Sequence, residues 1–481
     1  MARDDDSSCY LRDACFGNAC KCVGSTEIIH GPFFDCDRLL FMRSCLVDYR
    51  IFAAFSEINE LNIAKLMSAA AHGPGHLTNM NAKTILISGA GIGGPTLAFW
   101  LQAAGFEPTL IEHAATLRTG GYVIDFWGLG YDIAERMGLA GDIERIGYHI
   151  REMRIVDDRG ERVTGFGTKI FRELTGGRFV TLGRSDMSRL LFEKIKGTTE
   201  VIFDDEVVGL QACADHMGVQ FRHAGERRFD LVIGADGLHS NVRRLVFGPQ
   251  DRFEKQLGYV VAAFEVRGYR PRHEDVYVIY GQPSRMLGRF ALHDDRALFL
   301  FVFTADIDPL GPMLDLPAQK AMLRGKFGDG KWECQHILEA LDRTQDLYFD
   351  RVSQIKMKSW SKGRVALIGD AAFCVSLMAG QGSALAMTAA YVLAGELGKA
   401  GGRHEEAFGH YERLLRAYIG SKQKVAERFA STFAPKTRWG LFLRNQVIKA
   451  FAIPGLARLA FGRDPNDTLQ LPDYRWPTRL H

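Results

Sequence analysis

Three glycines follow a short apolar segment near the start of the patterned part of the chain. Gly89, Gly91 and Gly94 come directly after residues 83–88, a run that predicts a strand. In a Gly-x-Gly-x-x-Gly turn the first glycine permits the tight turn, the second lets the backbone approach a pyrophosphate, and the third lets helix pack on strand. Glu112 stands 18 residues beyond Gly94, where a carboxylate accepts hydrogen bonds from ribose hydroxyls. The spacing predicts a dinucleotide site.

A second glycine-rich stretch lies far along the chain. Asp370 follows Gly369 at the end of an apolar run, and Gly380-Gln381-Gly382 opens an alanine-rich segment. A carboxylate at a strand end accepts hydrogen bonds from a polyol, which is what the ribityl chain of a flavin offers. The second glycine turn would start a helix whose N–H groups face the flavin edge on which negative charge collects during reduction. Together the two stretches predict FAD, held at both ends.

Two further polar features are less specific. Asp236-Gly237 follows an apolar run, and a strand that ends in Asp-Gly is a common turn. Arg243 and Arg244 follow it as surface charges or as ligand groups, and the sequence does not separate these readings. Arg184 stands at a predicted helix start, where a guanidinium either braces a phosphate or ribityl oxygen or is solvated.

The elements that position these residues alternate between strand and helix in two separated parts of the chain. Between them, residues 257–304 form β-rich runs split by short polar breaks, which predicts an antiparallel sheet. We therefore expect an α/β fold: a Rossmann-like FAD-binding domain of discontinuous segments, an antiparallel β-sheet substrate domain and C-terminal helices. The predicted boundaries are 1–79 for a poorly ordered or extraneous leader, 80–155, 178–250 and 355–400 for the FAD-binding domain, 156–177 and 251–354 for the substrate domain, and 401–481 for the C-terminal helical region.

Composition excludes several classes of protein. A formal net charge of +3 over 481 residues gives no electrostatic reason to expect nucleic-acid binding. Six of the nine cysteines lie in the leader without the paired spacing of a zinc site, so we predict no metal and reduced thiols in a cytoplasmic protein. The uncharged segment 371–395 contains a Gly-Gln-Gly turn and follows Asp370, which favours a loop and a buried helix over a membrane span.

With these motifs in this order, residues 83–400 resemble the single-component (group A) FAD-dependent monooxygenases of the para-hydroxybenzoate hydroxylase-like family. The segments 118–139 and 471–474 resemble bacterial-type and tetracycline-modifying members most. One departure is the loop 373–377, where the family commonly has histidine and then prolines. The motifs that carry the resemblance are GAGIGG at 89–94 with Glu112, GADG at 234–237, GDAA at 369–372 and GQG at 380–382.

The resemblance implies a role for each motif residue. Glu112 would hold the adenosine ribose, Asp370 the ribityl chain and Arg184 a point along the FAD. Asp236 and Gly237 would serve both FAD and NAD(P)H. Arg118 falls where the family often has an arginine close to the cofactor.

The resemblance also implies a reaction. NAD(P)H, as a transient co-substrate, reduces tightly bound FAD, O2 adds to the reduced ring, and a flavin hydroperoxide hydroxylates a small hydrophobic molecule, aromatic or polycyclic. By position on the antiparallel sheet, Tyr280, Arg289 and Phe301 are candidates for substrate contact, although each also reads as a plain sheet residue. The sequence identifies no catalytic acid or base.

Two alternative functions stay open. One is an FAD-dependent dehydrogenase or reductase of a lipid-like substrate, and the other is a flavin-binding protein without turnover. The tail at 438–463 alternates apolar and basic residues and contains no acid. Such a basic amphipathic helix lies on a membrane surface or packs on the body of the protein, and because Pro454 interrupts it we expect packing.

Overall fold

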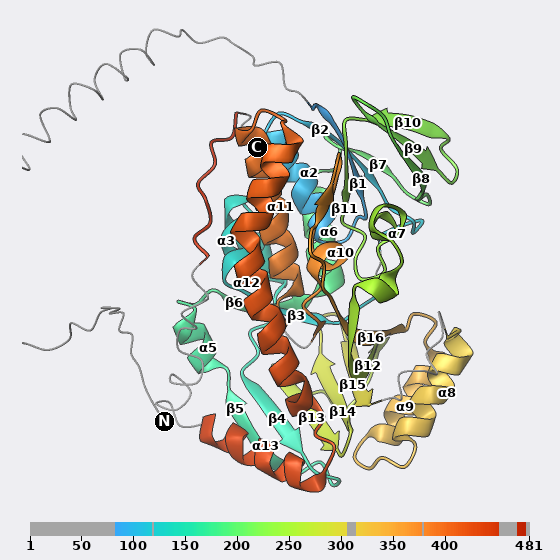
Figure 1. The fold of residues 1–481 in the computed structure, drawn as a ribbon. Coiled ribbons are helices and arrows are strands. Elements are labelled where there is room, and N and C mark those ends of the chain that lie inside the picture. Colours follow the sequence, from blue (N-terminus) through green and yellow to red (C-terminus); the bar gives the residue numbers. More distant parts are fainter. Residues whose placement is uncertain (1–81, 118–119, 305–313, 378–379, 452–468, 478–481) are drawn as a thin grey trace, which may run out of the picture. The chain divides into compact units, whose positions relative to one another are not determined.

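The computed structural model describes residues 82–117, 120–304, 314–377, 380–451 and 469–477. The predicted leader with its six cysteines, and Arg118, lie outside the described residues. Apolar runs from separated parts of the chain form a six-stranded sheet, parallel except at its β17 edge (Figure 1). In order across the sheet its strands are β17 (Ser361–Lys362), β18 (Val365–Leu367), β11 (Leu231–Gly234), β1 (Thr84–Ser88), β2 (Glu107–Ile111) and β7 (Glu200–Ile202).

Two apolar helices pack together beside this sheet. α2 (Gly93–Ala103) contacts α11 (Gly382–Lys399), and nine of the eleven residues of α2 are buried. A helix enclosed in this way needs no polar face, which explains why Thr96 and Gln102 are its only polar residues. Among the described residues, no helix combines the length and the apolar character that a membrane span requires. The predicted cytoplasmic location stays a prediction.

The β-rich middle of the chain forms a seven-stranded sheet, antiparallel except where β13 pairs in parallel with β4. The α/β fold with a discontinuous Rossmann-like part and an antiparallel sheet is therefore confirmed. β4 belongs to this second sheet, so the predicted boundary at 155/156 falls inside the strand; the domain limits stay predictions. In order, the strands are β16 (Tyr348–Ile355), β12 (Glu254–Arg267), β15 (Arg296–Thr304), β14 (Arg285–Ala291), β13 (Val276–Gln282), β4 (Glu152–Val156) and β5 (Arg162–Gly167).

Two helices that the sequence analysis did not identify cover one face of the seven-stranded sheet. α8 (Leu316–Phe327) and α9 (Cys334–Arg343) lie beside the yellow strands in Figure 1. Their apolar side chains form a core with the sheet, in which Phe301 packs edge-on against Phe327 at a ring-centroid distance of 4.9 Å. A cavity of about 1100 Å3 also lies on this face, lined by Val278 and Arg289 of the sheet and by Glu339 of α9.

Smaller elements complete the fold. β3 (Val123–Trp127) and β6 (Phe179–Gly183) form an antiparallel pair, and β8 (Val207–Ala212), β9 (Met217–Phe221) and β10 (Glu226–Phe229) form a three-stranded sheet. The remaining helices before the C-terminal pair are α3 (Leu129–Arg136), α4 (Ala140–Ile146), α5 (Lys169–Leu174), α6 (Arg184–Glu193), α7 (Asn241–Phe247) and α10 (Asp370–Phe373), with a 3-10 turn η1 (Gln250–Arg252).

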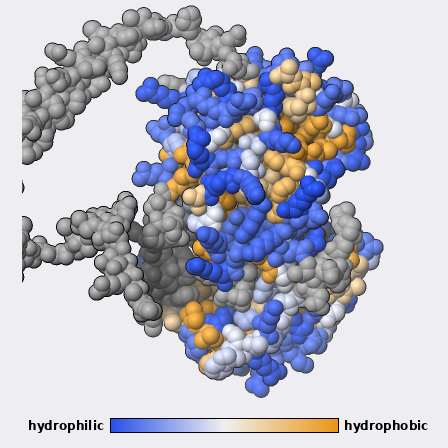
Figure 2. Space-filling model, in the orientation of Figure 1, coloured by the Kyte–Doolittle hydropathy of each residue, from blue (hydrophilic) through white to orange (hydrophobic). Residues whose placement is uncertain are grey.

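The C-terminal helices extend from one sheet to the other. α12 (His404–Phe433) runs beside α11 and continues toward the seven-stranded sheet, where α13 (Arg438–Phe451) packs on β5 and β13 (Figure 1). α13 therefore packs on the body, yet it exposes Trp439, Phe442, Leu443 and Val447. Figure 2 shows apolar side chains at the surface in this region. Contact of this face with a membrane, the less favoured expectation, stays untested.

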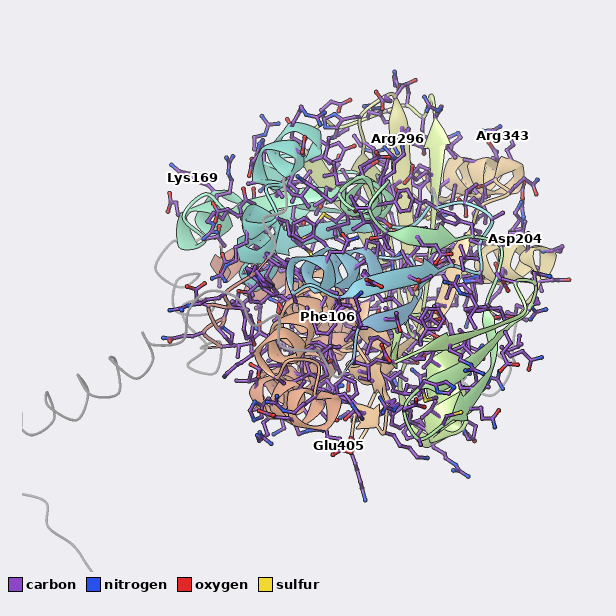
Figure 3. The ribbon with its side chains drawn as sticks, turned by 90° about the horizontal axis from the view of Figure 1, so that it is seen from above. Phe106, Lys169, Asp204, Arg296, Arg343 and Glu405 are labelled. Atoms are coloured by element: carbon purple, nitrogen blue, oxygen red, sulfur yellow. The ribbon has the colours of Figure 1, made fainter. Side chains whose placement is uncertain are left out.

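Charged side chains lie at the periphery. Viewed from above (Figure 3), exposed Lys169, Asp204, Arg343 and Glu405 project outward, whereas Phe106 lies inside at 4% exposure. Some charged side chains are nevertheless buried, among them Arg243 of α7 and Arg289 of β14.

Candidate active site

The glycine loop joins β1 to α2 and leaves no room for two of the missing side chains. Gly89 has a φ of +108°, and a Cβ there would lie 2.6 Å from the Ala235 carbonyl oxygen. A Cβ at Gly94 would lie 1.9 Å from the Gly89 carbonyl oxygen. At Gly91 a Cβ would lie 3.6 Å from the Arg184 guanidinium, an ordinary contact, and Gly91 lines a cavity. Gly91 thus leaves backbone open toward a ligand, as a bound pyrophosphate requires.

Glu112 follows β2 and turns its carboxylate back to the glycine loop. Its Oε2 accepts the Ala90 N–H at 2.8 Å, its Oε1 accepts the Ala114 N–H at 3.0 Å, and His113 Nδ1 lies 3.0 Å from Oε1. Burial raises the pKa of Glu112, but the hydrogen bonds from His113, Ala90 and Ala114 outweigh burial and lower it to about 2. The carboxylate is therefore ionised at neutral pH and fits an acceptor for ribose hydroxyls.

Asp370 and the second glycine turn meet in the wall of the same cavity. Asp370, Gly380 and Gly382 all line it, and a Cβ at Gly382 would lie 3.8 Å from Asp370 Oδ1. Burial raises the pKa of Asp370, and the Arg184 guanidinium in the same wall partly offsets this. Gln381 precedes α11 and makes no side-chain cap hydrogen bond, so its side chain leaves the first-turn N–H groups to other acceptors. These residues fit a polyol chain and a flavin edge.

The middle motif reaches the cavity with its backbone rather than with its carboxylate. Gly237, whose φ is +78°, and Ala235 line the cavity, but Asp236 does not. The Asp236 carboxylate accepts the Ser240 hydroxyl and, at 3.0 Å, the Val242 N–H at the start of α7. The Asp236 carboxylate therefore supports the start of α7, whose N-cap residue is Ser240, and its contact with FAD and NAD(P)H stays a prediction.

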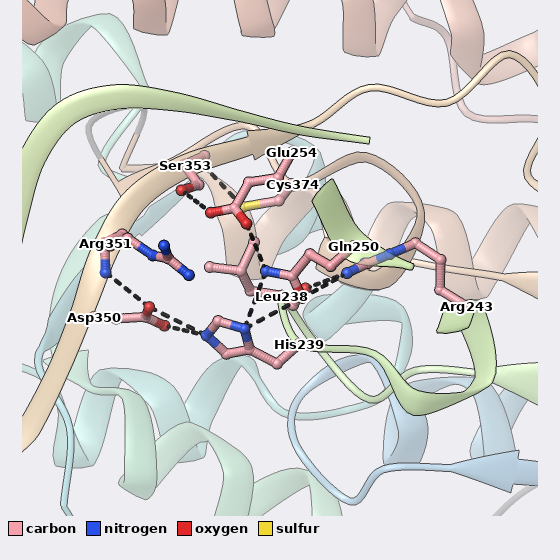
Figure 4. A network of polar contacts seen from close by, with 9 residues as sticks. All are labelled: Leu238, His239, Arg243, Gln250, Glu254, Asp350, Arg351, Ser353 and Cys374. Carbon is pink, nitrogen blue, oxygen red and sulfur yellow. Dashed lines mark hydrogen bonds and ion pairs between the residues drawn. The ribbon is translucent and has the colours of Figure 1, made fainter. Parts of the chain in front are cut away.

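Arg243 joins this motif to the loop that carries Asp370. Its side chain is fully buried (Figure 4). Nη1 donates to the Ala371 carbonyl at 2.9 Å, and Nη2 donates to the Leu238 carbonyl at 2.6 Å and to Gln250 Oε1 at 3.1 Å. Because Ala371 directly follows Asp370, Arg243 positions the cofactor side of the cavity. It is therefore neither a surface charge nor a ligand group, the two roles that the sequence left open.

The same network continues to the seven-stranded sheet (Figure 4). Gln250 Nε2 donates to Glu254 Oε2 at 2.8 Å, and the Ser353 hydroxyl donates to Glu254 Oε1 at 2.5 Å. His239 Nε2 lies 3.0 Å from Asp350 Oδ2, and this contact raises the pKa of His239. The polar chain therefore ties the turn after β11 to β12 and β16.

Replacing Arg243 by methionine should destabilise the protein by about 3 kcal/mol, because two buried carbonyls lose their charged donor. The matched change Arg244→Met should alter the free energy of unfolding by less than about 0.5 kcal/mol, since Arg244 is exposed and donates to Asn241 of its own helix. Urea unfolding of the two variants measures both values. Equal effects of the two substitutions would contradict the positioning role.

The motifs surround a cavity of about 360 Å3. Its cofactor side holds the glycine loop, Gly237, Asp370 and the start of α11. Its other side is formed by β3 and by one face of the seven-stranded sheet, which includes β4. The apolar residues that line this side are Val123, Ile124, Met153, Ile279, Met286, Phe290, Leu300 and Val302. A cavity with polar groups at one side and an apolar wall at the other suits a cofactor with an organic molecule beside it.

The loop after Asp370, which departs from the family pattern, closes part of this cavity. Phe373 packs on Trp360 at a ring-centroid distance of 4.7 Å, and Cys374, Ser376 and Leu377 line the cavity. Burial raises the pKa of the Cys374 thiol far above its usual value. The loop therefore contributes a neutral wall beside the cofactor site.

The three residues predicted to contact substrate lie on the face that α8 and α9 cover. Tyr280 donates to Asp158 at 2.6 Å, Arg289 forms a buried ion pair with Glu333, and Phe301 belongs to the helix-covered core. None of the three lines the cavity at the motifs. Side chains alternate between the two faces of a strand, so a shift of one residue reverses the face. Their neighbours Ile279, Phe290, Leu300 and Val302 line the cavity instead.

Sequence reasoning missed a polar group in the apolar wall. Asp125 of β3 lines the cavity and accepts the hydroxyls of Thr181 and Tyr277. The available signal was a single acid in the strand Val123–Trp127, which alternates between buried and partly exposed residues. Among the described residues, no three His, Cys, Asp or Glu side chains gather as metal ligands.

Known proteins share this arrangement. The family model for an FAD binding domain matches residues 82–428. A flavin-dependent monooxygenase of Legionella longbeachae is 34% identical over 73% of this chain and 90% of its own length. The crystal structure of the tetracycline destructase Tet(51) is 32% identical, with a TM-score of 0.69, covering 82% of this chain and all of its own.

A further solved structure carries the cofactor. Klebsiella pneumoniae HpxO, complexed with FAD and uric acid, is 25% identical with a TM-score of 0.64, and the match covers 76% of this chain and 93% of HpxO. The motif residues of this chain fit FAD, from the open backbone at Gly91 to the carboxylate of Asp370 in the cavity wall. The chain therefore belongs to the FAD-binding-domain family, and it is a flavin-dependent monooxygenase of the single-component group.

Proposed function

We propose that the protein uses NAD(P)H and O2 to hydroxylate a small apolar molecule, aromatic or polycyclic, held in the cavity between the cofactor motifs and the seven-stranded sheet. In the overall reaction a C–H bond becomes C–OH with one oxygen atom of O2. The other oxygen atom leaves as water, and NAD(P)H with one proton supplies the two electrons. Bound FAD supplies the redox chemistry of this reaction.

The side chains and backbone of this chain bind and orient the two molecules. The glycine loop and the first turn of α2 offer backbone N–H groups to the pyrophosphate. Glu112 accepts ribose hydroxyls, and Asp370 accepts hydroxyls of the ribityl chain. The N–H groups at the start of α11 face negative charge on the ring edge. The apolar wall excludes water from the reacting atoms.

The observation that carries the proposed substrate class is the composition of the cavity wall opposite the cofactor motifs. Eight apolar side chains of β3 and the seven-stranded sheet make up most of it, beside Asp125 and Tyr277. A rigid ring system buries more apolar surface there than a flexible polar metabolite would. The likeness to a tetracycline destructase and to a uric acid complex also supports a ring-containing substrate.

Oxygen incorporation tests this function. The purified protein with FAD would receive NADH or NADPH, 18O2 and one of three probes: tetracycline, uric acid or 2-naphthol. We expect at least one probe to accelerate NAD(P)H oxidation and to gain one 18O atom, because substrate in the cavity couples reduction to oxygen transfer. Mass spectrometry of the product and an oxygen electrode measure the two quantities.

Two outcomes would contradict hydroxylation, and each would support one of the alternative functions. A product formed without O2, with an artificial electron acceptor, would show the dehydrogenase or reductase that the sequence left open. FAD-loaded protein that oxidises no NAD(P)H with or without any probe, and alters none of them, would show a flavin-binding protein without turnover.

A further inference from the structure

The wall of the cavity contains three charged side chains among the described residues, and one of them stands apart. Arg184 and Asp370 belong to the cofactor side, and the Arg184 guanidinium partly offsets the rise that burial causes in the pKa of Asp370. Asp125 comes from β3, in the apolar part of the wall. Burial has the largest effect on the pKa of Asp125, and neither Arg184 nor Asp370 shifts that pKa. Asp125 is therefore not explained by the cofactor.

The hydrogen bonds of Asp125 use one of its two carboxyl oxygens. Thr181, its register partner on β6, donates its hydroxyl to Oδ1 at 2.6 Å, and Tyr277 of β13 donates its hydroxyl to the same atom at 3.1 Å. Oδ2 has no hydrogen-bond donor among the described residues. Since Asp125 lines the cavity, this oxygen is left for a molecule inside it.

The fold itself does not need a carboxylate at this position. An asparagine could keep its amide oxygen at Oδ1 and accept both hydroxyls, because the two bonds that tie β3 to β6 and β13 end on one atom. Burial raises the pKa of Asp125, so holding the charge there costs stability. Groups kept at a cost in stability gather at functional sites.

We propose that Asp125 determines substrate specificity: its Oδ2 binds a hydroxyl or N–H group of the ring-containing substrate, and its carboxylate excludes substrates that carry a carboxylate at that end. This inference rests on the proposed function, because it assumes that the substrate occupies the cavity. A neutral donor satisfies the open oxygen, whereas a second anion in an apolar wall without a cation on this side is repelled.

Three probes with one ring skeleton separate these effects. 2-Naphthol carries a hydroxyl, naphthalene carries no polar group, and 2-naphthoate carries a carboxylate. Titration calorimetry on the FAD-loaded wild type should give a dissociation constant for 2-naphthol at least about tenfold below those of the other two probes.

Two substitutions at this position then have different expected results. Asp125→Leu should reduce the preference for 2-naphthol over naphthalene from about tenfold to about one. Asp125→Asn, which keeps the shape and removes the charge, should bring 2-naphthoate to within about threefold of 2-naphthol. Asp125→Asn should also raise the midpoint of urea unfolding at pH 7, because it removes a half-buried charge from an apolar wall while it keeps both hydrogen bonds.

The matched control is Asp158→Asn. Asp158 also accepts a tyrosine hydroxyl of β13, that of Tyr280 at 2.6 Å, but on the helix-covered face of the sheet. This variant should keep the wild-type binding ratios. A wild type that binds none of the probes, or binds all three alike, would overturn the inference, as would an Asp125→Asn variant with the wild-type ratios.

The binding ratios also separate this inference from the proposed function. Wild-type protein with the expected ratios that incorporates no 18O into any probe would retain the specificity role of Asp125 and reject hydroxylation. Oxygen incorporation with binding ratios that do not change in Asp125→Asn or Asp125→Leu would support hydroxylation and reject the specificity role of Asp125. If Asp125→Leu does not fold, the near-isosteric asparagine variant decides.

Discussion

Replacing Asp370 by alanine should weaken FAD binding, with a dissociation constant for FAD roughly 100-fold higher than that of the wild type. The physical reason is that Asp370 is a half-buried carboxylate in the cavity wall, beside Gly382, and that the Arg184 guanidinium lines the same wall and partly offsets the rise that burial causes in the pKa of Asp370. Each charged hydrogen bond to a ribityl hydroxyl contributes about 1.5–3 kcal/mol, and the alanine variant also leaves Arg184 without its counter-charge. Fluorescence titration of FAD into the apoprotein measures the constant.

Two controls make this result specific. Asp370→Asn keeps the shape and an acceptor, so its affinity for FAD should fall between those of the wild type and the alanine variant. Asp158→Asn, on the helix-covered face of the second sheet, should bind FAD as the wild type does. If Asp370→Ala is purified with full FAD occupancy, Asp370 does not hold the cofactor.

The second large effect is expected at the glycine loop. Gly94→Ala should destabilise the protein by about 3 kcal/mol or more and prevent FAD binding. A Cβ there would lie 1.9 Å from the Gly89 carbonyl oxygen and 3.1 Å from Leu110 Cδ1. Because the closest atom is backbone, α2 would have to move away from β1, and the loop that faces the pyrophosphate would move with it. Urea unfolding and FAD titration measure the two losses.

Gly141→Ala provides the matched control. Gly141 lies exposed in α4, and a Cβ at this position would meet nothing within 4 Å. Alanine favours helix over glycine, so this variant should be as stable as the wild type or more stable by up to about 1 kcal/mol. A Gly94→Ala variant that unfolds at the wild-type urea midpoint would refute the packing requirement.

The seven-stranded sheet shows how much of a sheet the strand patterns in a sequence can predict. Its strands β12 to β15 were predicted from their apolar runs, and the structure contains them. Tyr280, Arg289 and Phe301, predicted to contact substrate, nevertheless lie on the helix-covered face, and none of them lines the cavity at the motifs. Their contact with substrate stays a prediction. Strands buried on both faces do not alternate between apolar and polar residues, so their sequence does not say which face meets a ligand. The helices α8 and α9 pack on one face of the sheet, and this packing decides which side chains meet the cavity at the motifs.

The neighbouring arginines of α7 show the same limit for charged residues. Arg243 and Arg244 are adjacent, and successive side chains point about 100° apart around a helix. One is fully buried and bonded to the Ala371 carbonyl, and the other is exposed. Which of the two turns inward depends on what packs on α7, so no local pattern could distinguish them.

By itself the sequence determined the fold class and the cofactor motifs, because glycine spacing and strand–turn–helix patterns are local properties of the chain. Gly94 has to be glycine for a reason contained within six residues. Only the tertiary structure decided that Arg243 supports the Asp370 loop and that Asp125 lies in the apolar wall. Each of those roles depends on a partner far away in the chain, and the distance between such partners is set by packing.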